Sequence, residues 1–273
     1  MGYQKQQSGF SLVELSIVLV ILGLLTGGIL AGQSLIRAAE MRSVNSEYSR
    51  YTASVHTFRD KYFGLPGDLR NATKFWGDQT GGTAEGMVAA CANLTTGATD
   101  QRTCNGDGDG HISPELGGMD RSHWYEAYRA WQHLANAGLI EGSYNGVSGL
   151  GPTQWVHQAG INVPRSRIGT GMWTLRYIDP GWFIASTWFS NPYGNILVIG
   201  APGAAADGSG PLLKPEEAWN LDTKFDDGKP GQGAVVSYMS ALNPGCVVSN
   251  TPTTEYNLTG SAVACSLNIR LGI

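Results

Sequence analysis

A short acidic stretch with alternating glycines, Cys-Asn-Gly-Asp-Gly-Asp-Gly-His-Ile at residues 104–112, has the spacing of a calcium-binding loop of the EF-hand type. Asn105, Asp107 and Asp109 stand at positions 1, 3 and 5 of such a loop. His111 stands at position 7, where it can offer its backbone carbonyl. Acidic side chains that alternate with glycine let a tight loop direct several hard oxygens at one cation. The stretch therefore predicts a calcium site.

The loop departs from the pattern at position 12, where Leu116 replaces the usual bidentate glutamate and Glu115 comes one residue early. This departure predicts weak affinity, in the range of extracellular calcium modules. The alternative is an Asx-turn loop without a cation, held by a disulfide at the adjacent Cys104.

Sequence patterns of catalysis are missing from the chain. The five histidines form no His-Glu-x-x-His or similar metal spacing, and there is no Gly-x-Ser-x-Gly elbow, P-loop or dinucleotide-binding glycine pattern. A formal net charge of −4 also argues against the basic surface that nucleic-acid binding needs. We expect a protein that is not an enzyme and does not bind nucleic acid.

The eight tryptophans could stack on sugars, although such residues more often lie in a core.

The four cysteines fall into two pairs that are close in sequence, Cys91 with Cys104 and Cys246 with Cys265. No pair has the Cys-x-x-Cys spacing of a zinc or redox site. In a protein that leaves the cytoplasm, an even number of cysteines predicts two disulfides with this local pairing. The alternative is four free, buried thiols.

Glu14 lies near the start of a strongly apolar segment. From Leu15 to Ile36 there are 22 consecutive residues without a formal charge, enough for a helix to cross about 30 Å of hydrocarbon. A secretory signal peptide would have a shorter apolar region followed by a small-residue cleavage site. A plain membrane anchor would explain the segment but not Glu14, because a carboxylate in hydrocarbon is costly and marks a function.

The segment Gly9-Phe10-Ser11-Leu12-Val13-Glu14, followed by the apolar run, resembles the processing signal of the type IV prepilin family, which includes the pseudopilins of type II secretion. Cleavage between Gly9 and Phe10 would give Phe10 a positive α-amino group. Glu14 would then lie one helical turn away from an amine, which a neighbouring subunit could equally supply.

The resemblance implies cleavage after Gly9 by a prepilin peptidase, methylation of the Phe10 amine, and neutralisation of a neighbour's amine by Glu14 during assembly. It implies other pilin subunits and an inner-membrane assembly platform as partners. It also implies the bacterial inner membrane before assembly and a periplasmic or extracellular filament afterwards. The chain departs from many members in having Ala31 where they have proline, and in its weakly basic leader.

A second acidic stretch gathers Asp222, Asp226 and Asp227 before Gly228. Pseudopilins bind calcium in a comparable C-terminal loop, but their ligands do not map residue by residue onto this stretch. We interpret it as a turn in preference to a metal site.

An apolar stripe follows the first segment along what should be one continuous helix to about Phe63. The chain between Gly32 and Gly64 has neither glycine nor proline, and its apolar residues recur at spacings of three and four. They are Met41, Val44, Tyr48, Tyr51, Val55, Phe58 and Tyr62, with charged residues, Glu47 among them, mostly off the stripe. We expect this stripe to pack on the globular part of the chain that follows the helix. A coiled-coil seam is disfavoured, because the polar face lacks a systematic pattern of opposite charges.

The rest of the chain predicts helices at about 121–137 and 215–225 and several short strands separated by glycine and proline turns. The strands are expected at 172–178, 182–189, 195–200, 234–239 and 266–271. The predicted fold is therefore α+β and pilin-like. A long N-terminal helix packs on an antiparallel sheet, with a helical insertion between them.

These patterns predict three parts: a leader at 1–9, a transmembrane and stalk helix at 10–63, and a globular head at 64–273. The predicted function is that of a structural subunit, major or minor, of a type IV pilus or a type II secretion pseudopilus. The alternative is a membrane-tethered head that binds or hydrolyses carbohydrate and uses a prepilin-type export signal.

Overall fold

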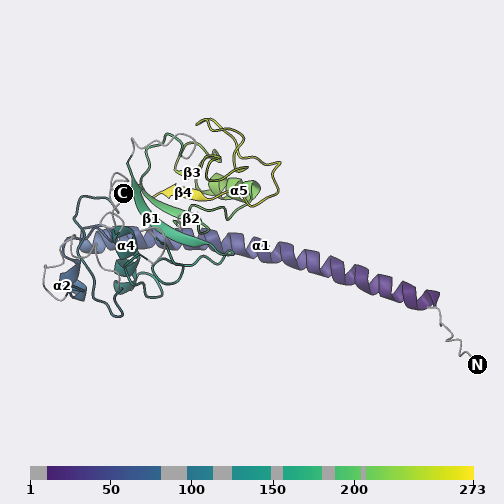
Figure 1. The fold of residues 1–273 in the computed structure, drawn as a ribbon, viewed down its shortest axis with the longest axis horizontal. Coiled ribbons are helices and arrows are strands. Elements are labelled where there is room, and N and C mark those ends of the chain that lie inside the picture. The colour runs from purple at the N-terminus through teal and green to yellow at the C-terminus, as the bar shows by residue number, and fades with distance from the viewer. Residues whose placement is uncertain (1–10, 81–96, 113–124, 149–155, 180–187, 204–206) are drawn as a thin grey trace, which may run out of the picture. The chain divides into compact units, whose positions relative to one another are not determined.

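The computed structural model describes residues 11–80, 97–112, 125–148, 156–179, 188–203 and 207–273 (Figure 1). The chain divides into two compact units, Met1–Ser43 and Val44–Ile273, which are considered separately below. Helix α1, Leu12–Tyr62, contributes to both. The predicted leader, with Gly9 and Phe10, lies outside the described residues.

The first unit consists, in its described part, of the N-terminal portion of α1. Its leucine, isoleucine and valine side chains are exposed, at values between 50% for Ile21 and 83% for Leu12. Hydroxyl groups in this apolar portion are bonded within the helix, as in the hydrogen bonds from Thr26 Oγ1 to the Leu22 carbonyl and from Ser34 Oγ to the Ala31 carbonyl, both 2.8 Å. Among the described residues, α1 is the one helix long and apolar enough to cross a membrane.

The second unit is built on a four-stranded antiparallel sheet with the strand order β1-β2-β4-β3. The C-terminal strand is thus inserted between β2 and β3, and Ile196 of β2 pairs with both Arg176 and Arg270. The strands are β1 Met172–Ile178, β2 Gly194–Gly200, β3 Val235–Ser237 and β4 Leu267–Arg270.

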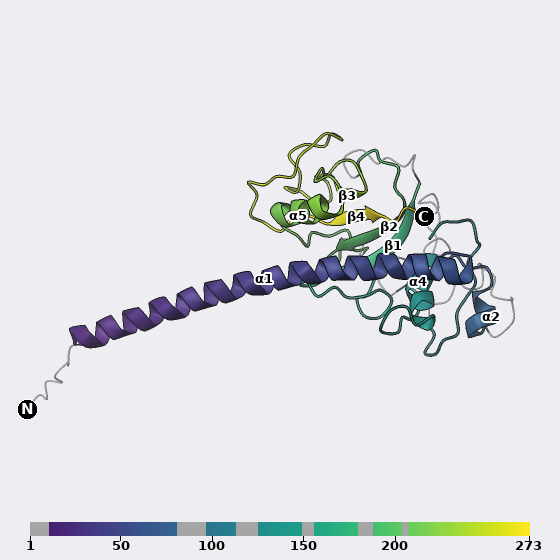
Figure 2. The same cartoon turned by 180° about the vertical axis from the view of Figure 1, so that it is seen from behind.

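Three more helices belong to this unit: α2 Ala72–Trp76, α4 Tyr125–Asn136 and α5 Pro215–Phe225. In both views the sheet and α5 lie on one side of the C-terminal part of α1, and α2 and α4 on the other (Figures 1 and 2). Helix α5 begins with Pro215 and two glutamates, which suit the positive end of a helix dipole.

The core of the second unit forms where α1, α4 and β1 meet. The Tyr51 ring of α1 lies 5.1 Å from the Trp131 ring of α4 and 5.7 Å from the Trp173 ring of β1. The predicted stripe supplies this contact, since Val44, Tyr51, Val55 and Phe58 are all buried. A tightly packed aromatic core of this kind fixes the C-terminal part of α1 to the head.

Glu47 differs from its sequence interpretation as a charged residue off the stripe, because its side chain is only 6% exposed. Its carboxylate is compensated by hydrogen bonds from the head, at 2.7 Å from Ser166 Oγ and 3.0 Å from the Arg167 N–H. A carboxylate can be buried where donors of this kind replace water.

The predicted α+β fold is confirmed, with a long N-terminal helix and an antiparallel sheet. Strand β1 and helix α5 have the predicted bounds, whereas β3 is shorter than expected. The start of the helix predicted at 121–137 and most of the strand predicted at 182–189 lie outside the described residues.

Candidate functional site

Two side-chain hydrogen bonds cap the N-terminus of α1. Glu14 Oε2 accepts the Ser11 backbone N–H at 2.8 Å, and Ser11 Oγ accepts the N–H of Val13 at 3.3 Å. Ser11 thus caps the first turn through its hydroxyl, and Glu14, three residues later, accepts the Ser11 N–H. The predicted assembly residue is therefore an exposed carboxylate at the positive end of the helix.

The acidic loop of the head brings together Asp107 and Asp109, as expected, and joins them with Asp68. One carboxylate oxygen from each of the three lies within 4.8 Å of the others. Asp68 is buried at 4% exposure, whereas Asp107 and Asp109 are exposed. The candidate metal centre thus takes a carboxylate from a distant segment, which the sequence analysis missed.

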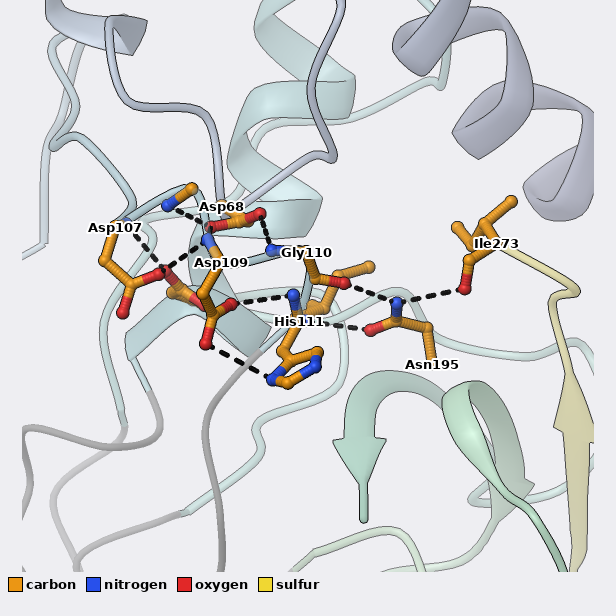
Figure 3. A network of polar contacts seen from close by, with 10 residues as sticks. Asp68, Asp107, Asp109, Gly110, His111, Asn195 and Ile273 are labelled. Atoms are coloured by element: carbon orange, nitrogen blue, oxygen red, sulfur yellow. Dashed lines mark hydrogen bonds and ion pairs between the residues drawn. The ribbon is translucent and has the colours of Figure 1, made fainter. Parts of the chain in front are cut away.

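Asp68 organises this loop through backbone hydrogen bonds (Figure 3). Its carboxylate accepts the N–H groups of Gly108, of Asp109 at 3.1 Å and of Gly110 at 2.9 Å. The loop passes so close to residue 68 that a Cβ on Gly106 would collide with the Asp68 backbone. Residue 106 must therefore be glycine for the loop to lie this close to Asp68.

Asn195 of β2 holds the other end of the loop (Figure 3). Its Oδ1 accepts the Ile112 N–H at 2.8 Å, and its Nδ2 donates to the carbonyls of Gly110 at 2.9 Å and Ile273 at 3.3 Å. Because Asn195 is only 3% exposed, it ties the loop and the C-terminus to the sheet from within the core.

The other two predicted ligands have contacts of their own. Asn105 Oδ1 accepts the Thr73 N–H at 2.9 Å and so satisfies a donor at the start of α2. The His111 ring stacks on Tyr177 at 3.6 Å between centroids, with Nδ1 3.2 Å from Asp109 Oδ2. Calcium ligation by Asn105 and by the His111 carbonyl stays a prediction.

The electrostatics of the loop are unfavourable for three ionised carboxylates. Burial, together with the negative charges of Asp109 and Asp107, raises the pKa of Asp68 to about 7, although the backbone hydrogen bonds from Gly110 and Gly108 oppose the shift. A divalent cation is one group that could compensate this concentration of negative charge.

The second acidic stretch also forms a cluster, of Asp222, Asp226 and Asp227. Asp222 accepts the Gly228 N–H at 3.1 Å within the stretch, and it accepts the hydroxyl of the distant Tyr256 at 2.9 Å. Burial raises the pKa of Asp222 to about 7. The Gly228 contact suits a turn, and the interpretation of this stretch as a turn stays a prediction.

The predicted disulfide between Cys246 and Cys265 is confirmed. It lies beside β4 and closes the loop in which Val247 pairs with Tyr256. Cys104 is also disulfide-bonded, whereas its predicted partner, Cys91, lies outside the described residues.

Residues 4–30 match the prokaryotic N-terminal methylation motif. This motif is the signal of type IV pilins and pseudopilins, and it includes Gly9, Phe10 and Glu14. No significant match to a curated protein or to a solved structure was found.

Proposed function

We propose that the chain is a structural subunit of a type IV pilus or a type II secretion pseudopilus, cleaved after Gly9 and assembled through its N-terminal helix. The observation that carries the proposal is the methylation motif at residues 4–30, which includes the start of an apolar helix with exposed side chains. An export signal of this type indicates a structural protein that is anchored in a membrane before assembly.

The apolar portion of α1 needs a partner that covers it on all sides. Its leucine, isoleucine and valine side chains between Leu12 and Ile36 are all at least 50% exposed. A surface of this extent is stable in water only when lipid or other protein covers it. Lipid before assembly and the equivalent helices of neighbouring subunits afterwards meet this need in turn.

Glu14 has the position to direct the assembly step. Its carboxylate lies in the first turn of α1, among exposed apolar side chains. Cleavage at Gly9 would create an α-amino group at Phe10, and attraction between this amine and the Glu14 of a neighbour is strong in a medium of low dielectric. The pair would fix the axial register of one subunit against the next.

We also propose that the head binds calcium through Asp68, Asp107 and Asp109. The proposal is supported by the convergence of three carboxylates in a loop whose glycines and backbone bonds fix its shape. Hard oxygen ligands of this kind suit Ca²⁺. The cation would hold together two segments of the head.

The processing step is tested by mass spectrometry of the protein purified from cells that carry a prepilin peptidase. The expected mature chain comprises residues 10–273, with or without one methyl group on the Phe10 amine. Replacing Gly9 with a bulky residue should leave the leader attached. A mature N-terminus within or after the apolar segment would refute the assignment.

A further inference from the structure

A cavity of about 710 Å³ lies between the C-terminal end of α1 and two loops of the head. This volume is in the range of sites that bind small molecules. Its walls come from the end of α1 and the following turn, from residues 68–71, and from the acidic loop at Gly108 and Gly110. The lining residues that matter here are Arg59, Tyr62, Phe63, Arg70 and Asn71.

Two guanidinium groups give the cavity a positive character. Arg70 is exposed and makes no hydrogen bond or ion pair with the part of the chain that the structure describes. Its side chain lies against Gly108, where a Cβ would collide with Arg70 Nε. Arg59 is 43% exposed, and its 3.9 Å contact with Asp60 is a weak surface ion pair. Both planar groups are therefore available to a ligand that carries a carboxylate.

The one carboxylate in the lining, that of Asp68, is already engaged. It accepts backbone N–H groups from the acidic loop, including those of Asp109 and Gly110. Its oxygens thus accept from the loop backbone. The other formal charges among the lining residues are those of the two arginines, and the Asp107 and Asp109 carboxylates lie near Asp68 outside the lining.

An aromatic ring stands at the edge of the same cavity. Phe63 is 93% exposed and has a φ of 56°, a left-handed conformation that is unusual for a bulky residue. Tyr62 is held in place beside it, with its ring 4.6 Å from Phe58 and 5.4 Å from Trp76. The exposed ring of Phe63 lines the same cavity as Arg70 and Asn71, so the lining offers an apolar face and planar hydrogen-bonding groups together.

We propose that this cavity binds an acidic sugar, a pyranose with a carboxylate such as a uronic acid. The carboxylate pairs with Arg70 and Arg59, the C–H face of the ring lies against Phe63, and Asn71 contacts a hydroxyl group. The function is additional to filament assembly: the head of the subunit recognises a surface glycan. An acidic peptide fits less well, because the lining comes from a helix end and loops and offers no strand edge for pairing with an extended backbone.

The test uses the full mature chain in detergent micelles and saturation-transfer NMR. The probes are methyl α-galacturonide and the neutral methyl α-galactoside, a pair that differs only in the carboxylate. We expect saturable binding of the galacturonide and at least tenfold weaker binding of the galactoside. Arg70→Gln and Phe63→Asn should each weaken galacturonide binding about tenfold or more; asparagine is chosen because it tolerates a left-handed backbone.

Lys74→Gln is the matched control, because Lys74 is a cation of α2 that does not line the cavity. It should bind like the wild type, and thermal unfolding checks that all variants are folded. Equal binding of both sugars, no binding of either, or undiminished binding by Arg70→Gln would overturn the proposal.

Two further measurements distinguish the sugar proposal from binding of an acidic peptide and from binding through a cation. Triglutamate that binds more tightly than the galacturonide would assign the cavity to acidic peptides and overturn the sugar proposal. Galacturonide binding that is the same in EDTA and in calcium supports the arginines as the anchor. Binding that disappears in EDTA and in Asp107→Asn would place the carboxylate on a cation and refute the roles given to Arg59 and Arg70.

Discussion

The Nε1 of Trp173 in β1 donates a hydrogen bond of 2.7 Å to Glu47 Oε2 of α1. The two residues are 126 positions apart in the sequence, and both side chains are buried. With the bonds from Ser166 and Arg167, this contact gives the helix a polar attachment to the head in addition to its aromatic one.

Loss of the Glu47 carboxylate should therefore destabilise the second unit. Glu47→Ala leaves the Trp173 and Ser166 donors buried without an acceptor, and we expect a loss of about 3 kcal/mol in the free energy of unfolding. Urea denaturation of the full chain in detergent micelles, followed by tryptophan fluorescence, measures it. Asp60→Ala is the control, because the Asp60 side chain is 76% exposed, and it should cost less than about 1 kcal/mol. Equal effects of the two changes would contradict the role given to Glu47.

His133 should make the stability of the head depend on pH. Its Nδ1 accepts the Gly67 N–H at 2.9 Å, and its Nε2 lies 3.0 Å from the hydroxyl of Thr103, which donates to Gln132. The ring is thus held neutral. Burial, and secondarily the charge of Arg129, lowers its pKa to about 3.

As the pH falls below about 6.5, the unfolded chain takes up a proton on this histidine while the folded chain does not. The folded state should therefore lose about 2 kcal/mol at pH 5 relative to pH 8 through His133 alone. Asp68 and Asp222, whose pKa values are raised, act in the opposite direction, so the comparison is between variants. His133→Gln should remove the loss, and His56→Gln on α1 should retain it. Parallel pH profiles for His133→Gln and the wild type would show that His133 is not the cause.

Calcium should stabilise the head if Asp68, Asp107 and Asp109 bind it. With a dissociation constant in the extracellular range, 10 mM Ca²⁺ would add about 1.4–2.7 kcal/mol to the free energy of unfolding. The change in urea midpoint on adding calcium measures this. Asp107→Asn should abolish the change, and Asp226→Asn, in the second acidic cluster, should keep it. The reverse pattern would move the site to the second cluster, and no change in the wild type would exclude calcium from both.

Sequence patterns within single elements correctly predicted several strands and helices and the buried face of α1. The short apolar runs between glycine and proline turns at β1 and β2, and the Pro-Glu-Glu start of α5, were enough to place these elements to within a residue. The stripe of α1 likewise predicted its buried face. The interpretation of Glu47 was wrong because its charge suggested solvent, whereas its spacing from Val44 and Tyr51 already placed it toward the buried face.

The acidic loop shows why the rest could not be predicted. Asp107 and Asp109 share a short motif, but Asp68, which accepts the Asp109 N–H, lies 41 positions earlier in the sequence. It follows the predicted end of the long helix, where no pattern indicated a ligand. In the sequence, Asn195 is an ordinary polar residue at the start of a strand. Its hydrogen bond to the acidic loop forms only when the folded head brings the loop against the sheet. Contacts of this kind arise from tertiary packing, which no local spacing encodes.

The direct test of the central claim is filament incorporation of Glu14→Leu, compared with Glu40→Leu. Both changes replace a glutamate of α1 with leucine, but Glu40 pairs with Arg37 at 3.0 Å within its own helix. In cells that make the filament, the amount of each variant in sheared filaments and in the membrane fraction is measured by immunoblot. We predict that Glu14→Leu is inserted and cleaved after Gly9 yet falls at least tenfold in the filament fraction, while Glu40→Leu assembles normally. Normal incorporation of Glu14→Leu would contradict the account, because the carboxylate would then have no part in registering one subunit against the next.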